Sequence, residues 1–295
     1  MRSKRFLFLS LVLVAIFIFE NSLLASGFEG KIVQKNISVS LSPSAAPDES
    51  GFTQYANDLF SKSNLELKKM AESEGNEYSE ETAIIYMKGK NYRIDTNQEG
   101  QKVSIIYNLD TKKMTTLQWA SKTAMVTDME QMGKNMSQMM GQAQKQMGDM
   151  DNQGMEEDNQ FSMKSAGETK TINNFKCELY EGKDSDGDYT HLWLTKDDKN
   201  LFDSFMPIFS ELDNLMQTKL EQGKEEQFYR EKQGVPVLTK SISGSGLNID
   251  EITDISSENV PADMFAVPAD FKEVNMQQMI QEQMKKYQDM MNQQK

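Results

Sequence analysis

Cysteine and histidine are almost absent from this chain of 295 residues, which contains one of each. A single cysteine, Cys177, cannot form a disulfide within the chain, so the fold must be held together by its hydrophobic core. A single histidine, His191, excludes zinc sites that are built from several His or Cys ligands. A Ser-His-Asp or Cys-His catalytic arrangement would have to use His191.

The short motifs of several common enzyme classes are also missing. The sequence has no Gly-x-Ser-x-Gly elbow, no phosphate-binding loop and no dinucleotide-binding fingerprint. These absences argue against hydrolase and nucleotide chemistry, so we expect a protein that is not an enzyme and that needs no cofactor. Phe175, Cys177 and Leu179 share one face of an expected strand, which favours a buried thiol over a reactive one.

Basic residues are outnumbered by acidic ones. The chain has 32 Lys and Arg against 45 Asp and Glu, and its formal net charge is −13. An acidic surface of this size disfavours nucleic acids and anionic lipid head groups as partners, and it favours cationic ones.

The N-terminus carries the one long apolar run, and residues 1–26 predict a cleavable signal peptide. Three basic residues precede Phe6 to Phe19, a run of about 14 residues, whereas roughly 20 are needed to span a bilayer as a helix. Ala25 and Gly27 fit the small-x-small rule for cleavage before Phe28, and cleavage after Ala25 fits nearly as well. Gly27 stands where a lipoprotein would carry its lipid-bearing cysteine, so we expect no lipid anchor.

Removal of residues 1–26 takes away three basic residues and Glu20, which brings the net charge to −15. No other segment approaches membrane-spanning length. We therefore expect an exported, soluble protein that is periplasmic or secreted, and the alternative is an uncleaved N-terminal anchor.

Most of the mature chain reads as short strands separated by turns. Five β segments with turns every 8–12 residues lie between residues 82 and 127 and indicate an antiparallel meander. Asn173-Asn174 marks a further hairpin. We expect strands at 28–39, 82–87, 92–96, 103–109, 114–119, 123–127, 161–164, 168–172, 175–180, 189–195, 228–231, 235–243 and 247–256, with an extended finish over 260–268.

Helices are expected in four places. Phe52 to Ala71 and Leu201 to Leu220 are amphipathic, Asp128 is the N-cap of a Met-rich helix, and Phe271 to Gln294 forms a last polar helix. The fold class is thus α+β and mainly antiparallel β. We expect one β-rich domain over residues 27–271, with inserts at about 40–75 and about 128–160, and a C-terminal helix or tail over 272–295.

Seven segments of the mature chain form a recognisable series. They are Phe28–Ile32, Tyr86–Asp95, Ile105–Met114, Gly167–Tyr180, Leu192–Lys196, Gly234–Leu238 and Met264–Phe271. Taken together, these segments resemble a bacterial family of exported proteins that is defined only as a domain of unknown function, number 4412. The resemblance covers most of the mature chain in order, but it omits the 40–75 insert, the Met-rich tract and the C-terminal helix.

In strand order this family is distantly similar to the LolA/LolB-like lipoprotein carriers. That similarity implies a curved, half-open antiparallel barrel with helices packed on or across it, around an apolar cavity. The family has no agreed catalytic residues, so the resemblance implies none for this chain.

Three functions follow as hypotheses, and the first is an apolar-ligand or lipid carrier. A strongly curved antiparallel sheet with a helix across its mouth can leave an apolar cavity. The alternative is that the same side chains fill a packed core. The candidate lining residues are Ile94, Ile105, Tyr107, Leu117, Trp119, Leu192 and Leu194.

The second hypothesis is soft-metal (copper) handling, because thioether sulfur suits Cu(I). Ten methionines lie between Met125 and Met163, several of them at helical spacing. The alternative is a flexible apolar stripe that packs on the sheet or on a partner helix. The candidate metal ligands are Met129, Met132, Met136, Met139 and Met140.

The third hypothesis is an envelope adaptor that acts through its C-terminal helix. A thin apolar stripe at helical spacing runs among Gln and Lys there, and Met-rich surfaces adapt to partners of varied shape. The alternative is that this helix frays in solution. The stripe consists of Met276, Ile280, Met284, Tyr287 and Met291.

Overall fold

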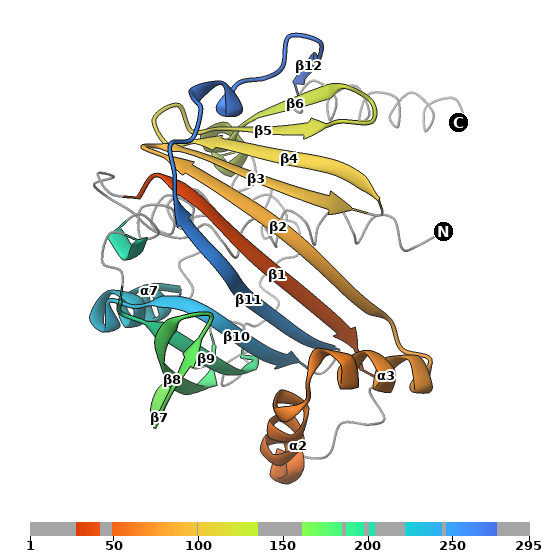
Figure 1. The fold of residues 1–295 in the computed structure, drawn as a ribbon, viewed down its shortest axis with the longest axis vertical. Coiled ribbons are helices and arrows are strands. Elements are labelled where there is room, and N and C mark those ends of the chain that lie inside the picture. The colour runs from red at the N-terminus through yellow and green to blue at the C-terminus, as the bar shows by residue number, and fades with distance from the viewer. Residues whose placement is uncertain are drawn as a thin grey trace, which may run out of the picture.

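The computed structural model describes residues 28–41, 49–98, 100–134, 161–184, 187–197, 201–203, 222–243 and 246–275 (Figure 1). The strands are β1 (Gly30–Ser40), β2 (Tyr78–Lys88), β3 (Asn91–Gln98), β4 (Gln101–Asn108), β5 (Lys113–Gln118), β6 (Thr123–Asp128), β7 (Lys164–Ile172), β8 (Phe175–Lys183), β9 (Tyr189–Thr195), β10 (Val235–Ser243), β11 (Gly246–Ser257) and β12 (Lys272–Asn275). The helices are α2 (Glu49–Ser61), α3 (Asn64–Glu74), α7 (Gln222–Lys232) and the 3-10 helix η1 (Ala262–Phe265).

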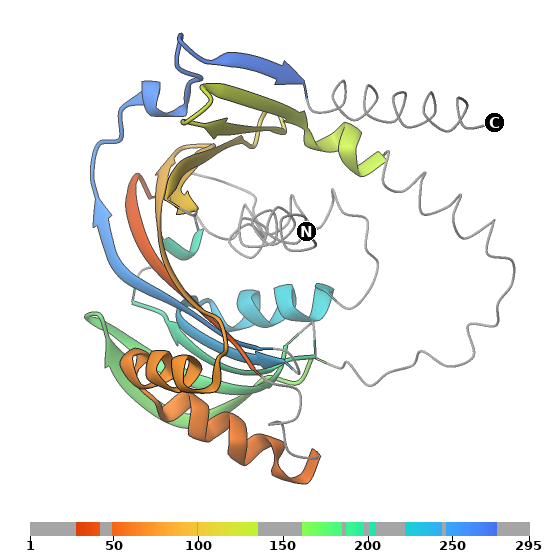
Figure 2. The same cartoon turned by 90° about the vertical axis from the view of Figure 1, so that its right-hand side faces the viewer.

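All twelve of these strands form one sheet, in the order β12-β6-β5-β4-β3-β2-β1-β11-β10-β9-β8-β7. Every neighbouring pair is antiparallel except β12 and β6, which are parallel. The sheet bends into an arc whose end strands do not meet (Figure 2). The predicted α+β fold class, a mainly antiparallel and half-open curved barrel with helices packed on it, is therefore confirmed.

Tight turns make the meander possible. Asn173 and Asn174 join β7 to β8 with φ of 47° and 70°, and positive φ at both central residues is what a type I′ hairpin turn requires. Asparagine tolerates this backbone conformation better than most residues do. The predicted Asn173-Asn174 hairpin is present in the structure.

Strand register divides the side chains between a concave and a convex face. On β1 and β2, Ile32 pairs with Ile85 and both point to the concave face, whereas Val39 pairs with Tyr78 on the convex face. Buried apolar side chains occur on both faces. The sheet therefore needs a cover on each side, and helices and extended segments supply part of both covers.

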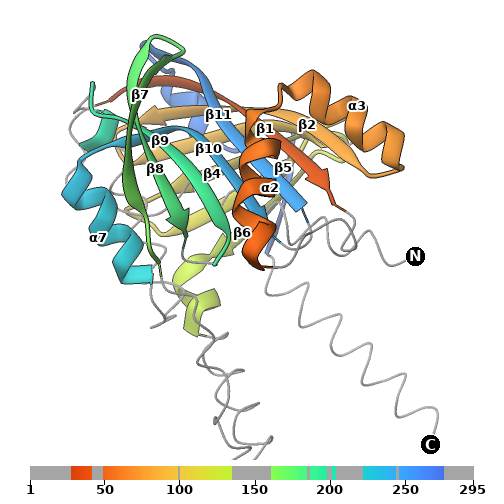
Figure 3. The same ribbon diagram turned by 90° about the horizontal axis from the view of Figure 1, so that it is seen from below.

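Helices α2 and α3 cover the convex face of β1 and of β9 to β11. Leu59 and Phe60 of α2 and Leu67 and Ala71 of α3 pack there against Trp193 and its neighbours. Figure 3 shows these two helices next to each other and apart from α7. None of the helices in the described ranges is long and apolar enough to cross a membrane.

The prediction of a single helix over Phe52 to Ala71 is wrong, because this range contains parts of two helices, α2 and α3. Ser63 interrupts them: its hydroxyl accepts a hydrogen bond from the Glu66 N–H, and the Glu66 carboxylate accepts one from the Ser63 N–H at 2.8 Å. This reciprocal capping box starts a new helix at Asn64. Gly75, in the left-handed conformation with φ of 70°, ends it.

Three other sequence expectations are wrong near residues 228 and 260–275. Phe228 to Glu231 belongs to helix α7 rather than to a strand, since it lies within a charged, helix-favouring segment. Residues 272–275 form strand β12 beside β6 instead of starting a helix. The extended finish contains one short 3-10 helix.

Several expectations fall outside the described ranges. These are the signal peptide, most of the Met-rich tract, the helix after residue 203, and residues 276–295.

Helix α2 lies over the one histidine of the chain. The Phe60 ring is 4.6 Å from the His191 ring, between their centroids, and Tyr189 is 5.7 Å away. Lys240, which pairs with His191 across β10 and β9, donates a hydrogen bond from Nζ to the Phe60 carbonyl at the C-terminus of α2. A cation is favourable at this end of a helix.

His191 is held in its neutral form. Burial lowers its pKa to about 4, and the charges of Lys240 and Lys170 add to the effect. Its Nε2 lies 3.6 Å from Glu181 Oε2 but makes no hydrogen bond with the described residues. We therefore interpret the His191–Glu181 contact as a proximity rather than as an ion pair near neutral pH.

Replacement of Leu67 by alanine is expected to destabilise the fold, since this side chain is 0% exposed under α3. The expected loss in the free energy of unfolding is about 2–5 kcal/mol, from the lost contacts and the cavity left behind. Leu65 lies on the same helix and is 61% exposed, so Leu65→Ala should change stability by about 0.5 kcal/mol or less. Urea unfolding of both variants tests the helix placement, and equal losses would contradict it.

His191→Phe is expected to change how stability depends on pH. The unfolded chain takes up a proton below a histidine pKa of 6.5, but the folded protein does so only near 4. As the pH falls from 6.5 to 4, the free energy of unfolding of the wild type should therefore decrease by up to about 1.4 kcal/mol per pH unit relative to that of the variant. Urea unfolding across this range measures the difference, and a constant offset between the two proteins would refute a buried neutral His191.

Candidate functional site

The concave face of the sheet carries a continuous apolar surface on its central strands. Ile85, Ile94 and Ile105 are paired across β2, β3 and β4, and Met87, Tyr92 and Tyr107 form the next row. All six side chains are buried in one cluster with Ile32 of β1. Figure 2 shows the arc of the sheet that these strands line.

Five of the seven predicted cavity residues lie on this face. Ile94, Ile105 and Tyr107 belong to the central cluster, and Leu192 and Leu194 lie in a second cluster toward the β8 end. The two clusters are neighbours, because Phe202 packs against both. The second cluster also contains Tyr180 and two aromatic residues of α7, Phe228 and Tyr229.

The remaining two predicted cavity residues, Leu117 and Trp119, lie on the convex face. Leu117 pairs with Ser104 rather than with Ile105, so the alternation of the strand sends it to the other side of the sheet. There it packs with Ile106 and Phe271, and Trp119 joins the same cluster. The prediction that Leu117 and Trp119 line the same surface as Ile94 is therefore wrong.

A buried polar network accompanies Trp119 on the convex face. The Ser104 hydroxyl accepts hydrogen bonds from Arg93 Nη2 at 3.1 Å and from Trp119 Nε1 at 2.8 Å. Arg93 also donates to Asp95 at 2.6 Å and to the Met264 carbonyl at 2.7 Å. The guanidinium thus fastens the segment around η1 to the sheet.

The carboxylate of this network is compensated. Burial raises the pKa of Asp95, but hydrogen bonds with Arg93 and Ser104 and the charges of Arg93 and Lys102 lower it more, so it lies below its usual value. Such a satisfied network stabilises a fold and leaves its groups with little capacity for a ligand.

Polar groups mark one end of the concave apolar surface. Gln34 and Asn36 continue the β1 face that begins at Ile32, and Asp250 of β11 and Glu81 of β2 flank Asn36 on either side. Asn36 Nδ2 and Gln34 Nε2 both donate to Oδ1 of Asp250, the latter over 3.4 Å. Burial raises the pKa of Asp250 to about 6, although its two amide partners act in the opposite direction.

Glu81 differs from Asp250 in having no hydrogen bond or ion pair with any described residue. Desolvation raises the pKa of its carboxyl group. Gln34, Asn36, Glu81 and Asp250 were not among the site residues predicted from the sequence. The alternation of β1 does place the amides at positions 34 and 36 on the same face as Ile32. The sequence did not show, however, which face of each strand is the concave one.

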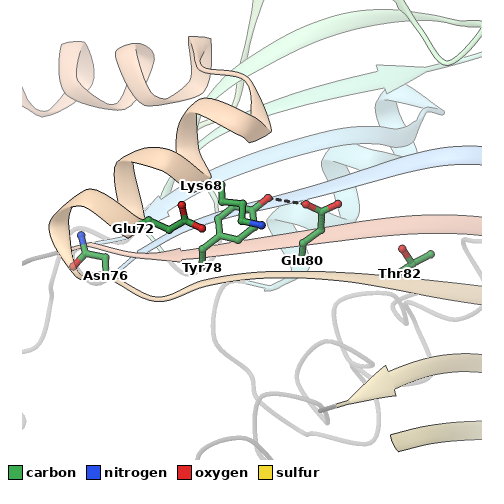
Figure 4. A pocket seen from close by; sticks show the side chains of 6 residues that line it. All are labelled: Lys68, Glu72, Asn76, Tyr78, Glu80 and Thr82. Atoms are coloured by element: carbon green, nitrogen blue, oxygen red, sulfur yellow. Dashed lines mark hydrogen bonds between the residues drawn. The ribbon is translucent and has the colours of Figure 1, made fainter. Parts of the chain in front are cut away.

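An open groove of about 510 Å³ lies on the convex side, between α3 and β2. Figure 4 shows its lining and the hydrogen bond from the Tyr78 hydroxyl to Glu80, which is 2.7 Å long. Glu80 also pairs with Lys35 at 2.5 Å, and these contacts lower its pKa. The groove is lined by Lys68, Glu72, Asn76, Tyr78, Glu80 and Thr82.

The two methionines of the predicted metal set that the structure describes pack on the sheet. Asp128 Oδ1 accepts a hydrogen bond from the Gln131 N–H at 2.9 Å, so the predicted N-cap is present. Met129 is buried in the concave cluster and Met132 packs against it, which favours the packing interpretation for this pair. Met136, Met139 and Met140 lie outside the described residues.

The described ranges contain no group of three or more His, Cys, Asp and Glu residues that is arranged to hold a metal ion. Cys177 is buried, as predicted. Burial raises its pKa to about 11, so its thiol is protonated near neutral pH and is a poor nucleophile.

Comparison with solved structures finds a match to a protein that is itself uncharacterized. A crystal structure of an uncharacterized conserved protein from Thermus thermophilus shares 8% sequence identity with this chain, at a TM-score of 0.38. The match covers 82% of this chain and 90% of that one. A search of curated proteins finds no match.

The family comparison is more extensive. Residues 64–271 match the family described as domain of unknown function DUF4412, a range that runs from the start of α3 to the residue before β12 and leaves out β1 and α2. This range holds Glu81 and Asp250 and most of the concave apolar surface. The chain therefore belongs to the DUF4412 family.

Proposed function

We propose that this protein is an exported, non-enzymatic envelope protein that binds an apolar molecule, such as a lipid-like group, on the concave face of its half-open barrel. The observation that carries the proposal is the run of apolar side chains across β1 to β4 and on to β9, on the inside of a sheet that does not close. Ligand sites are concave and largely apolar with a few polar groups, and this face has both features.

The cover over this face suits a surface that repacks around a ligand. Among the described residues it consists of Met129, Met132, Leu201 and Phe202, together with the two aromatic residues of α7. None of these belongs to a strand. Methionine side chains are flexible and fill irregular spaces, so this cover can adapt while the sheet stays rigid.

The competing interpretation is a packed core without a ligand, and two alanines separate the two cases. Ala83 lies on the concave face and Ala124 on the convex face, and both are buried. If a ligand occupies space on the concave face, Ala83→Leu should fill that space and weaken uptake of a fluorescent fatty acid by about tenfold or more. The same change should cost less than about 1 kcal/mol in unfolding free energy, because it meets ligand space rather than packed protein.

Ala124→Leu serves as the matched control, because it inserts the same volume under Phe271. It is expected to cost about 1–3 kcal/mol through overpacking and to leave uptake unchanged. The measurements are fluorescence titration of delipidated protein, native mass spectrometry of protein as purified, and urea unfolding. Absence of both uptake and co-purified ligand, together with equal destabilisation by the two changes, would show that the concave face is a packed core.

Export is the second part of the proposal, and it predicts a processed, unlipidated product. When the full chain is expressed in a bacterium, the wild-type protein should be released from the periplasm at the mass of a chain that begins at Phe28 or at Ser26. Gly27→Cys completes a lipoprotein-like Leu24-Ala25-Ser26-Cys sequence, so this variant should stay with the membrane and gain the mass of a lipid. An unprocessed wild-type mass would instead indicate an N-terminal anchor.

A further inference from the structure

Two carboxyl groups, those of Glu81 and Asp250, lie on the concave face at the edge of its apolar surface. Contact with apolar surface disfavours the charged form of a carboxyl group. Glu81, Asn36 and Asp250 form one row across β2, β1 and β11. Thr239 and Leu192 continue the row on β10 and β9. On the same face, Ala83 and Ile85 follow Glu81 along β2, and Ile252 follows Asp250 along β11. The row is therefore the polar end of the apolar surface.

The partners of these carboxyl groups are incomplete. Both amides donate to the same oxygen of Asp250, Oδ1, and Oδ2 accepts no hydrogen bond from a described residue. Glu81 accepts none at all from them. Both residues are half-buried, and desolvation raises the pKa of both carboxyl groups. Each carboxyl therefore loses part of its hydration while an oxygen stays open to a hydrogen-bond donor.

The strands of the row carry no basic side chain on this part of the concave face. Lys232 of α7 does lie on the concave side, but it lies over the Tyr180 and Phe228 rings toward the β8 end. The lysines of β1, β2 and β10 all lie on the convex side of the sheet, as the strand register shows. These lysines are Lys31, Lys35, Lys88 and Lys240. The inward positions near the row hold Gln34, Ser38, Thr190, Thr239 and Ser241. No cation on these strands neutralises Glu81 or Asp250, and the net charge of −13 adds to the negative potential.

We propose that Glu81, Asn36 and Asp250 form a head-group site for an amphipathic ligand whose head is a cationic amine with N–H donors and whose chain lies along the apolar concave face. Asp250 Oδ2 and the Glu81 carboxylate accept from the amine. The Asn36 side chain, which lies between these two groups in the row, fixes Asp250 by donating to its Oδ1. With a strand rise of about 3.3 Å per residue, the four residues from Asn36 to Ile32 carry the chain about 13 Å onto the central cluster. The inference rests on the proposed apolar-ligand function and specifies its substrate class.

The test compares three head groups on one chain length. Dodecylamine, dodecanol and dodecanoic acid, each below its micelle concentration, displace the neutral dye N-phenyl-1-naphthylamine from the mature protein near neutral pH. The wild type should bind the amine about tenfold more tightly than the alcohol or the acid, because a charge-assisted hydrogen bond contributes more than a neutral one. Asp250→Asn and Glu81→Gln should each remove most of this preference and leave dodecanol binding unchanged.

Asp254→Asn is the matched control, since it removes one carboxylate from the same strand on the convex face, where Asp254 pairs with Val33. It should keep the preference for the amine. If Asp254→Asn also lost the preference for dodecylamine, the preference would come from the net charge of the protein, and the head-group site would be overturned. The thermal midpoint of each variant checks folding, and Glu81→Gln decides the matter if Asp250→Asn does not fold, because Glu81 has no described partner to lose.

The remaining outcomes separate the two proposals. Equal binding of all three compounds by the wild type would overturn the head-group site and leave the apolar-ligand function standing. Failure of the dye and all three compounds to bind would overturn the apolar-ligand function and the head-group site together.

Discussion

Three register shifts on one side of the sheet bend its strands, and the placement of the core side chains on those strands depends on them. β11 has an extra residue at Thr253 opposite Val33 and Gln34, β10 has one at Val237, and β7 shifts register between Ser165 and Thr169. A bulge bends and twists its strand. All three lie in the β7–β11 half, which curls to form the lower part of the arc in Figure 2.

The bulges also decide which side chains are inward. Ile252 and Ile255 are an odd number of residues apart, yet both pack on the concave cluster, because Thr253 is inserted between them. Val237 and Leu238 are adjacent, yet both contribute to the convex cluster. Without the Thr253 bulge, Asp250 and Ile255 would lie in a regular strand on opposite faces, and the alignment of the polar row with the apolar surface would be lost.

Much of this fold could be predicted from the sequence, because its signals are local. Turn residues such as Asn173-Asn174 and the alternation of the strands predict the hairpins, and the predicted bounds of β10, 235–243, agree with the structure. The family resemblance of the same segments supplies the half-open architecture. The Ser-x-x-Glu sequence at Ser63 also predicts the break between α2 and α3, because it matches a capping box. The helical spacing of apolar residues on both sides of Ser63 nevertheless favoured one continuous helix.

The face of each strand could not be predicted in the same way. Leu117 and Trp119 alternate as Ile94 and Ile105 do, and only the pairing of Leu117 with Ser104 shows that they point outward. Both faces of this sheet carry buried apolar side chains, so the sequence of a strand does not show which of its sides is the inner one. For the same reason the row of Glu81, Asn36 and Asp250 stayed hidden: it needs the register of three strands that lie far apart in the sequence.

Desolvation acts on both faces of the sheet, but its energetic consequence differs between them. On the convex face it lowers the pKa of His191 to about 4, so the imidazole is neutral near pH 7 and its burial costs little. On the concave face it raises the pKa of Asp250 to about 6, which still leaves the carboxyl mainly ionised at that pH. The charge of Asp250 therefore persists in a partly desolvated place. Its Oδ2 accepts no hydrogen bond from a described residue, and Glu81, which has no described partner, lies on the other side of Asn36. A structural carboxylate in the same sheet, Asp95, has Arg93 against it. Asp250 lacks such a cation among the described residues, and a bound cationic head group would supply one.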